Sequence, residues 1–212
     1  MFVVNIIIKR QKMLEILQYD FIQNALIAGV LISIAAGIIG SLVVVNKITF
    51  LTGGIAHSSY GGIGLAIYMG IPVLFGATVF AVLTAILIAI ITLKNRTRID
   101  AIIGMMWASG MAIGIIFVDL TPGYNVDLMS YLFGSIIAVS REDLIYMSVL
   151  DVFIISIVVF FYKQILAVSY DSEFASLRGI NVKFFYTLIL ILAALCVVAA
   201  IKAVGLILVI AL

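Results

Sequence analysis

Long apolar runs separated by short polar breaks dominate the pattern along the chain. A bilayer core of about 30 Å is crossed by roughly 20 apolar residues at a rise of 1.5 Å each. Six runs reach that length: Phe21–Val45, Ile48–Tyr68, Ile71–Leu93, Asp100 to about Val118, Leu144–Tyr162 and Phe184–Ile201. The pattern therefore predicts six full transmembrane helices.

Two further apolar segments are too short to cross a bilayer. Met129–Val139 lies between the fourth and fifth predicted spans. The basic segments before the fourth span and after the fifth are both expected in the cytoplasm, and these two spans already return the chain to that side. We therefore expect Met129–Val139 to be a re-entrant segment on the outer side. Lys202 is expected to end the sixth span, and Ala203–Leu212 then begins a seventh helix that the sequence does not complete. The predicted fold is an all-α polytopic membrane protein with six full transmembrane helices, a re-entrant segment and the start of a seventh, truncated at its C-terminus.

Composition supports this class and excludes others. The chain is 66% hydrophobic and 10% charged, with a mean hydropathy of +1.37, which is too apolar for a soluble domain. A net charge of +2 and the absence of a phosphate-binding loop motif exclude nucleic-acid binding and nucleotide hydrolysis by that loop. The basic segments Lys94–Arg98 and Lys163–Lys183 are predicted to face the cytoplasm.

The second run contains the chain's single histidine, His57, in the glycine-rich stretch Thr52–Gly64. A polar side chain inside a membrane helix is expensive unless it meets a partner or a water-filled path. Gly54, Gly61 and Gly64 on neighbouring turns are expected to leave space beside the ring. His57 is therefore either a residue of a translocation path and a transient metal ligand, or a structural hydrogen-bonding group. One imidazole does not hold a metal tightly, whereas a homodimer presents two.

Asp151 is the other ionisable residue expected within a span. It is either hydrogen-bonded inside the helix bundle or a carboxylate on a cation path. The segment 163–183 is amphipathic, and Ser172 is expected to cap a short helix that Gly179 ends. That helix is either an ordinary loop helix or a docking helix with Phe174 and Leu177 as its anchors.

Three stretches together resemble the membrane subunits of ABC importers for zinc, manganese and iron, the metal-ion permease family. They are His57 with Ser58 and Gly62, the segment 127–136, and the segment 170–180. The likeness covers residues 14–212. The sequence departs from the family where many members carry an aspartate one turn before the histidine, since Gly53 stands there, and a proline at the position of Gly61.

The resemblance implies a single transmembrane permease domain over residues 1–212 that lacks its C-terminal helices. It implies a prokaryotic plasma (inner) membrane location, a homodimer in the lipid bilayer, cytoplasmic ABC ATPase subunits and an extracytoplasmic metal-binding protein. The chain would be a transporter subunit and not an enzyme, with a divalent transition metal ion as substrate and no tightly bound cofactor. The path residues would be His57, Gly54, Gly61 and Asp151, and the ATPase-coupling residues Asp171, Glu173, Phe174, Ala175, Leu177 and Gly179. The alternative is an ion-coupled or passive carrier that uses Asp151.

Overall fold

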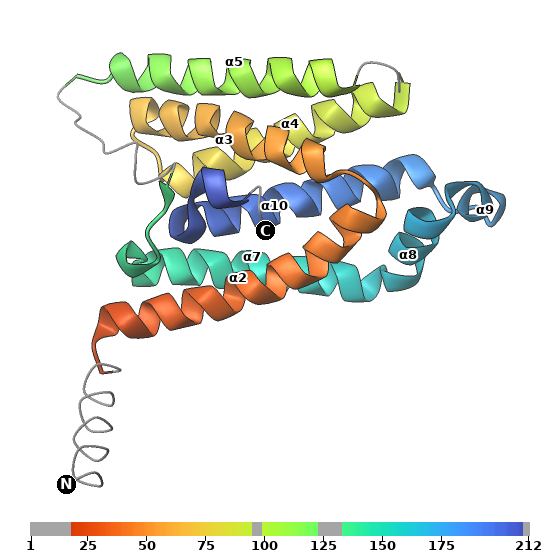
Figure 1. Cartoon of the computed structure of the whole chain (residues 1–212), viewed down its shortest axis with the longest axis horizontal. Helices are drawn as coiled ribbons and strands as arrows, with labels where there is room; N and C mark the ends of the chain where they lie inside the picture. The colour runs from red at the N-terminus through yellow and green to blue at the C-terminus, as the bar shows by residue number, and fades with distance from the viewer. Residues whose placement is uncertain (1–17, 95–98, 123–132, 210–212) are drawn as a thin grey trace, which may run out of the picture.

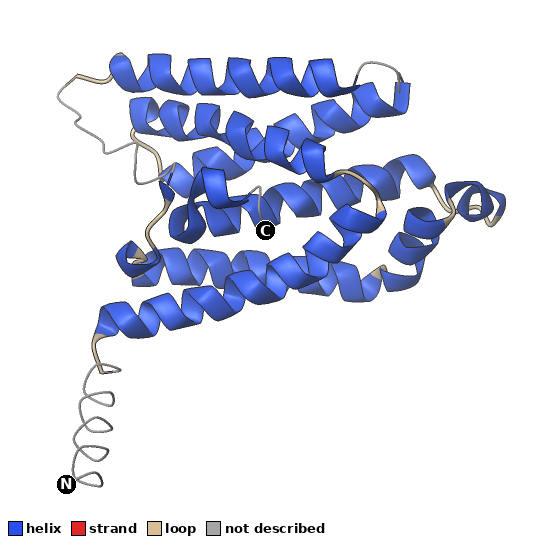
Figure 2. Ribbon diagram, viewed as in Figure 1, coloured by secondary structure: helices blue, strands red, loops and turns tan. Residues whose placement is uncertain are grey.

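The computed structural model describes residues 18–94, 99–122 and 133–209. Within these residues the chain consists of helices joined by short connections (Figure 2). The long helices are α2 (Asp20–Val45), α3 (Thr49–Met69), α4 (Val73–Lys94), α5 (Ile99–Asp119), α7 (Arg141–Phe160) and α10 (Val182–Val209). The short ones are η1 (Ile136–Ala138), α8 (Tyr162–Tyr170) and α9 (Ser172–Leu177).

Five helices in the described part of the chain are long and apolar enough to cross a membrane: α2, α4, Ala101–Asp119 of α5, α7, and Val182–Gly205 of α10. The remaining predicted span, α3, has 21 residues but is not among the five, because glycine and hydroxyl side chains lower its hydropathy. Its neighbours shield it, since nearly all of its residues between Leu51 and Ile67 are buried. A helix that does not face lipid has no need of an apolar surface.

The helices form two groups joined by α10. On one side α3 packs against both α4 and α5, and on the other side α2 packs against α7. α10 lies between them and contacts α2, α3, α4 and α7, so it runs through the middle of the bundle (Figure 1). The main core accordingly combines α3, α4 and α10 residues such as Ile55, Ala85 and Leu190.

The connections gather at two opposite ends of the bundle. The α2–α3 turn, the end of α4, and α8 with α9 lie at one end, to the right in Figure 1. The start of α2, the α3–α4 turn, the end of α5 and the start of α7 lie at the other. The basic segments Lys94–Arg98 and Lys163–Lys183 are predicted to lie on one side of the membrane. Their described residues do lie at the same end of the bundle.

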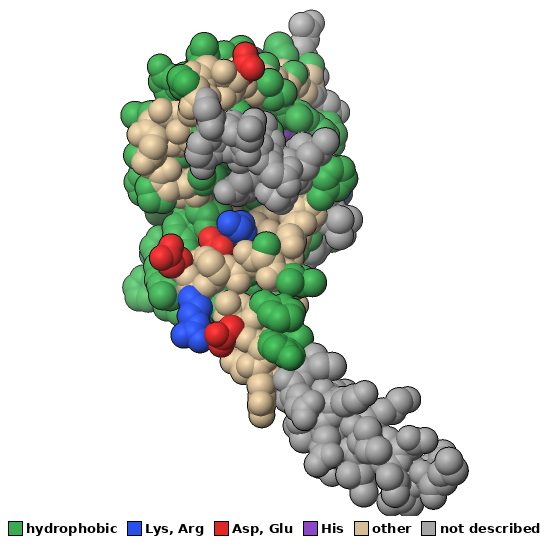
Figure 3. All heavy atoms as spheres, turned by 90° about the vertical axis from the view of Figure 1, so that its left-hand side faces the viewer, with side chains coloured by type: hydrophobic (Ala, Val, Ile, Leu, Met, Phe, Trp, Pro, Cys, Tyr) green, Lys and Arg blue, Asp and Glu red, His purple; other side chains and the backbone are tan. Residues whose placement is uncertain are grey.

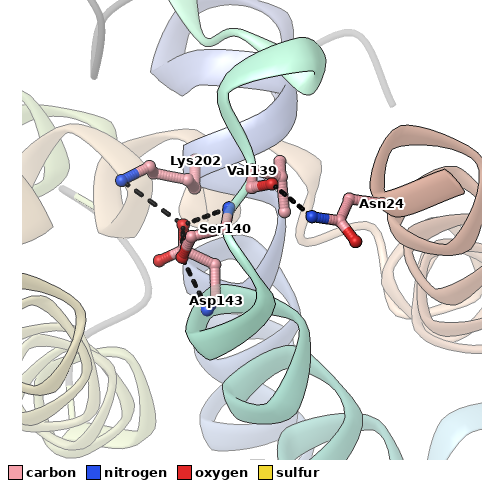
Figure 4. A network of polar contacts seen from close by, with 5 residues as sticks. All are labelled: Asn24, Val139, Ser140, Asp143 and Lys202. Carbon is pink, nitrogen blue, oxygen red and sulfur yellow. Dashed lines mark hydrogen bonds and ion pairs between the residues drawn. The ribbon is translucent and has the colours of Figure 1, made fainter. Parts of the chain in front are cut away.

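A polar network at that second end explains why Lys202 is tolerated within α10 (Figure 4). Ser140 and Asp143 form a capping box that starts α7, which begins three residues before the predicted Leu144. The Lys202 ammonium lies 3.5 Å from the Asp143 carboxylate, and the Asn24 amide donates to the carbonyl of Val139 at 3.2 Å. Because its charge is paired, Lys202 does not end the helix.

The break in α10 falls at Gly205 instead, so the prediction of a break at Lys202 is wrong. Gly205 has φ 82° and ψ 159°, a conformation that essentially only glycine adopts. The segment before α7 packs against this kink: a Cβ on Gly134 would lie 2.3 Å from the Gly205 nitrogen, and the Ser135 N–H donates to the Lys202 carbonyl at 3.1 Å. The kink in α10 therefore makes room for the segment around Gly134 and Ser135 that packs against it.

Only residues 133–139 of the predicted re-entrant segment Met129–Val139 lie in the described part of the chain. They form the single turn η1 beside α2 and α10, not a membrane-crossing helix. Figure 3 views the bundle from this end and shows acidic and basic side chains grouped together. Arg141 pairs with Asp20 at 3.1 Å here. The re-entrant placement stays a prediction, and the motif residues 127–132 lie outside the described residues.

Candidate functional site

The site is built on α3, which together with α10 is the most buried of the long helices. Every residue from Gly53 to Gly64 is buried. The two serines that follow the histidine bond to their own helix: Ser58 Oγ donates to the Ile55 carbonyl at 2.9 Å and Ser59 Oγ to the Ala56 carbonyl at 2.6 Å. Both serine hydroxyls thus make their hydrogen bonds within α3 itself.

Glycines allow α3 to touch both neighbouring backbones. A Cβ on Gly64 would lie 2.2 Å from the Gly114 carbonyl oxygen of α5, and a Cβ on Gly62 would lie 2.4 Å from the Gly76 carbonyl oxygen of α4. Both distances are far inside van der Waals contact, so these positions accept no side chain unless the helices move apart. Such small-residue contacts are the usual way for membrane helices to pack closely.

The expectation that Gly54 and Gly61 leave space beside the imidazole is wrong for the single chain. A Cβ on Gly54 would lie 2.3 Å from Cγ2 of Ile103, and a Cβ on Gly61 would lie 2.9 Å from both the Gly110 carbonyl oxygen and the Phe80 ring. α5 and α4 fill the room that the missing side chains leave. The sequence shows that glycines reduce the width of the helix, but it does not show which neighbouring residues pack into the space that they leave.

His57 is packed between α3 and α5. It is only 7% exposed, and its ring stacks on Trp107 of α5 with 3.9 Å between ring centroids and 9° between ring planes. Its Nδ1 is buried and has no hydrogen-bond partner within the described residues. The interpretation of His57 as a structural hydrogen-bonding group through Nδ1 therefore finds no support among the described residues.

Trp107 and Met111 are residues of this site that sequence reasoning missed. The Trp107 Nε1–H donates to the sulfur of Met111, one turn further along α5, at 3.2 Å. A signal was present, because Trp107 is the only tryptophan in 212 residues. What the sequence lacked was the register that places α5 beside α3, with Ile103 at Gly54 and Gly114 at Gly64.

Asp151 lies in the other helix group. It is 3% exposed on α7, which packs against α2 and α10, and neither carboxylate oxygen has a hydrogen-bond partner in the described part of the chain. The structure thus does not bring Asp151 together with His57 as one cluster. Across the described ranges no group of three or more His, Cys, Asp or Glu side chains is arranged to hold a metal ion.

The predicted docking helix exists as α9. Its N-cap is Asp171, whose carboxylate accepts from the Phe174 N–H at 2.9 Å, so the expected cap at Ser172 is one residue off. Ala175 is buried, whereas Leu177 is 88% exposed and Phe174 about half exposed, with the Arg178 guanidinium 5.0 Å from the Phe174 ring centre. All members of the predicted coupling set except Ala175 are thus exposed, and Phe174 and Leu177 are the apolar side chains among them.

Comparison with known families assigns the architecture. The model of the ABC 3 transport family matches residues 18–212, which is nearly the whole chain. The chain belongs to this family. Membership in the ABC 3 transport family confirms the resemblance proposed from the three sequence stretches, and it makes the chain a membrane component of a transporter and not an enzyme.

Several curated proteins align with most of the chain. An uncharacterized membrane protein of Synechocystis sp. is 46% identical over 202 residues, 95% of this chain and 72% of its own length. The probable metal transport system membrane protein of Chlamydia trachomatis is 41% identical over 182 residues, 83% of this chain and 62% of its own length. The manganese transport system membrane protein MntC of Listeria monocytogenes is 33% identical over 196 residues, 92% and 70% respectively.

A solved structure has the same fold as this ABC 3 family member. PsaBC from Streptococcus pneumoniae, determined in complex with Fab, superposes with a TM-score of 0.83 at 31% identity. The match covers 95% of this chain and 73% of that one. The chain therefore spans between 62% and 73% of the length of these relatives.

Proposed function

We propose that this chain is the permease subunit of an ATP-driven importer of divalent transition metal ions in the plasma membrane of a prokaryote. The observation that carries the proposal is His57, a buried imidazole on the mostly buried helix α3 whose Nδ1 has no hydrogen-bond partner among the described residues. Imidazole nitrogen is a good ligand for zinc and other borderline divalent ions. The names of the Chlamydia and Listeria relatives point to the same class of substrate.

The ion passes between two copies of the subunit. Each copy offers one imidazole, and one nitrogen ligand holds a metal weakly enough to release it. Two copies of His57 provide a transit site that does not hold the metal tightly. We take α3, the helix that carries His57, as the sixth membrane-crossing helix. Gly54 and Gly61 contribute to the path indirectly, because their missing side chains let α5 and α4 pack closely against α3. The metal is the substrate, and no tightly bound cofactor is part of the scheme.

Asp151 marks a second position on the ion's route, in the α2–α7–α10 group. An unpartnered carboxylate buried in a membrane segment is stable only with a bound cation or proton. A carrier that works through Asp151 alone is disfavoured, because the family to which the chain belongs transports with ABC machinery.

The end of the bundle with α8 and α9 faces the cytoplasm in this scheme. Lysine and arginine are enriched in cytoplasmic loops, and five described basic residues lie in or beside the connections at this end: Lys47, Lys94, Lys163, Arg178 and Lys183. The opposite end then faces an extracytoplasmic metal-binding protein. α9 docks on a cytoplasmic ABC ATPase, with Asp171, Glu173, Ala175 and Gly179 shaping the helix and its exposed apolar residues making the contact.

Replacement of Phe174 by Asp tests the docking role of α9. The substitution puts a charge in the proposed apolar contact, so the ATPase should no longer co-purify with the permease and metal uptake should fall at least tenfold. The matched control is Phe184→Asp, which places the same charge on another exposed phenylalanine at the start of α10. An unchanged yield of ATPase with Phe174→Asp, at normal uptake, would show that α9 is not the docking helix.

Uptake into proteoliposomes tests the function itself. The reconstituted permease with its ATPase should accumulate zinc or manganese only with ATP, and a protonophore should leave the rate unchanged. Uptake that continues without ATP and stops when the proton gradient is collapsed would instead identify an ion-coupled carrier.

A further inference from the structure

The His57–Trp107 stack is the closest and most nearly parallel ring pair among the described residues. A second ring pair joins the same two helices, Tyr68 with Phe117, but it lies at 5.3 Å and is tilted by 48°. Trp107 is half-buried, so part of the indole reaches the surface of the α3–α4–α5 group while its face covers the imidazole.

A histidine that binds a metal usually has its ring direction fixed through its second nitrogen. That nitrogen donates to a carboxylate, a carbonyl or water, and removing the partner typically costs 10- to 100-fold in metal affinity. His57 has no such partner at Nδ1 within the described residues, and the hydroxyls of Ser58 and Ser59 donate to backbone carbonyls. Among the described residues, the ring contact that sets the plane of the His57 imidazole is the indole face of Trp107.

We propose that Trp107 is a positioning residue for the transported ion: its stacked indole fixes the plane of the His57 ring and takes the place of the missing hydrogen bond. The inference rests on the proposed transit role of His57. A metal binds an imidazole nitrogen in the plane of the ring, so an indole stacked on the face does not itself block the coordinating edge while it holds the direction of the lone pair.

The stack also favours the metal-bound state. An imidazole that coordinates a divalent cation carries part of its positive charge, and the face of an indole is the most favourable aromatic surface for a cation. No acidic residue lies between Thr49 and Asp119 except Asp100, which is next to the start of α5. The indole face therefore supplies attraction that a carboxylate would otherwise give, without the strong binding that would trap the ion.

Trp107 is itself held in place. Its Nε1–H donates to the Met111 sulfur, and the two residues are one helical turn apart on α5. The chain of contacts runs from Met111 through Trp107 to His57, so the orientation of the imidazole is set by α5 and not by its own helix.

The dependence of uptake rate on zinc concentration tests the proposal in proteoliposomes that contain the permease and its ATPase. Trp107→Leu should raise KM for zinc about tenfold and leave kcat within about twofold, because orientation and charge stabilisation are lost while the path stays open. Trp107→Phe keeps a flat aromatic face and should restore KM to within about threefold of the wild type. Phe117→Leu, which removes the second ring pair of α3 and α5, is the control and should leave KM unchanged.

The single tryptophan provides a readout that a purely structural role would not move. Zinc added to the purified full chain should change the Trp107 emission in a saturable way, and His57→Ala should abolish this change. A wild-type emission that does not respond to zinc would overturn the proposal, and so would a KM in Trp107→Leu equal to that of the wild type. If instead His57→Ala transports normally, the transit role of His57 fails, which is a separate result.

Discussion

Replacing His57 by Ala should abolish ATP-driven metal uptake while the transporter still assembles. The imidazole is the one nitrogen ligand on the enclosed helix, and no carboxylate lies on α3 to replace it. Among the described residues the buried Nδ1 has no hydrogen-bond partner that its removal would leave unpaired, so the substitution should not unfold the bundle. We expect uptake to fall at least 100-fold, measured with radioactive zinc in cells or proteoliposomes.

Ser59→Ala is the matched control for this result. Ser59 is also fully buried on α3, but its hydroxyl donates to its own helix, so its loss should change uptake less than threefold. Size-exclusion profiles and ATPase co-purification should match the wild type for both variants. Normal uptake by His57→Ala in an intact complex would rule out His57 as a transit ligand.

Gly64→Ala should destabilise the bundle more than any other single methyl group added to α3. The new Cβ would lie 2.2 Å from the Gly114 carbonyl oxygen and 2.6 Å from its Cα. Both are backbone atoms, so α3 and α5 must separate to make room. Overpacking of this kind costs about 1–3 kcal/mol, and a lowered unfolding midpoint in detergent would report it. Separation of the helices also moves His57 away from Trp107, so uptake should fall together with stability.

Gly37→Ala on α2 is the comparison that isolates this effect. A Cβ at Gly37 meets no atom within 4 Å, and alanine is the better helix former by about 1 kcal/mol. The unfolding midpoint of this variant should stay the same or rise. Equal midpoints for Gly64→Ala and Gly37→Ala would show that the close approach of α3 and α5 does not contribute to stability.

The helical framework could be predicted from the sequence because the length and periodicity of apolar runs reflect the bilayer. The first four predicted spans agree closely with α2, α3, α4 and α5. The structure differs from the prediction where a contact between helices determines the position of a helix break. Lys202 stays helical because Asp143 of α7 pairs with it, and the break moves to Gly205, where the segment around Gly134 presses on the backbone.

The candidate site was predicted in part. His57 could be singled out because a lone polar side chain in an apolar run is conspicuous on its own helix. Trp107 could not, because its role depends on the register between α3 and α5, which no local pattern encodes. For the same reason Gly54 and Gly61 were expected to border open space, whereas Ile103 and the Gly110 backbone fill it.

Chemical accessibility of position 57 during transport is the most direct test of the proposed ion path. In a Cys196→Ser background, His57→Cys provides a single thiol on α3, and Ala56→Cys, at a fully buried neighbouring position, provides the control. The transporter is exposed to a membrane-impermeant thiol reagent with and without ATP. If position 57 lines the path, it should be modified only while ATP is hydrolysed, zinc should slow the modification, and position 56 should not react. Absence of modification at position 57 in a transporter that is hydrolysing ATP would contradict the claim that the ion passes His57.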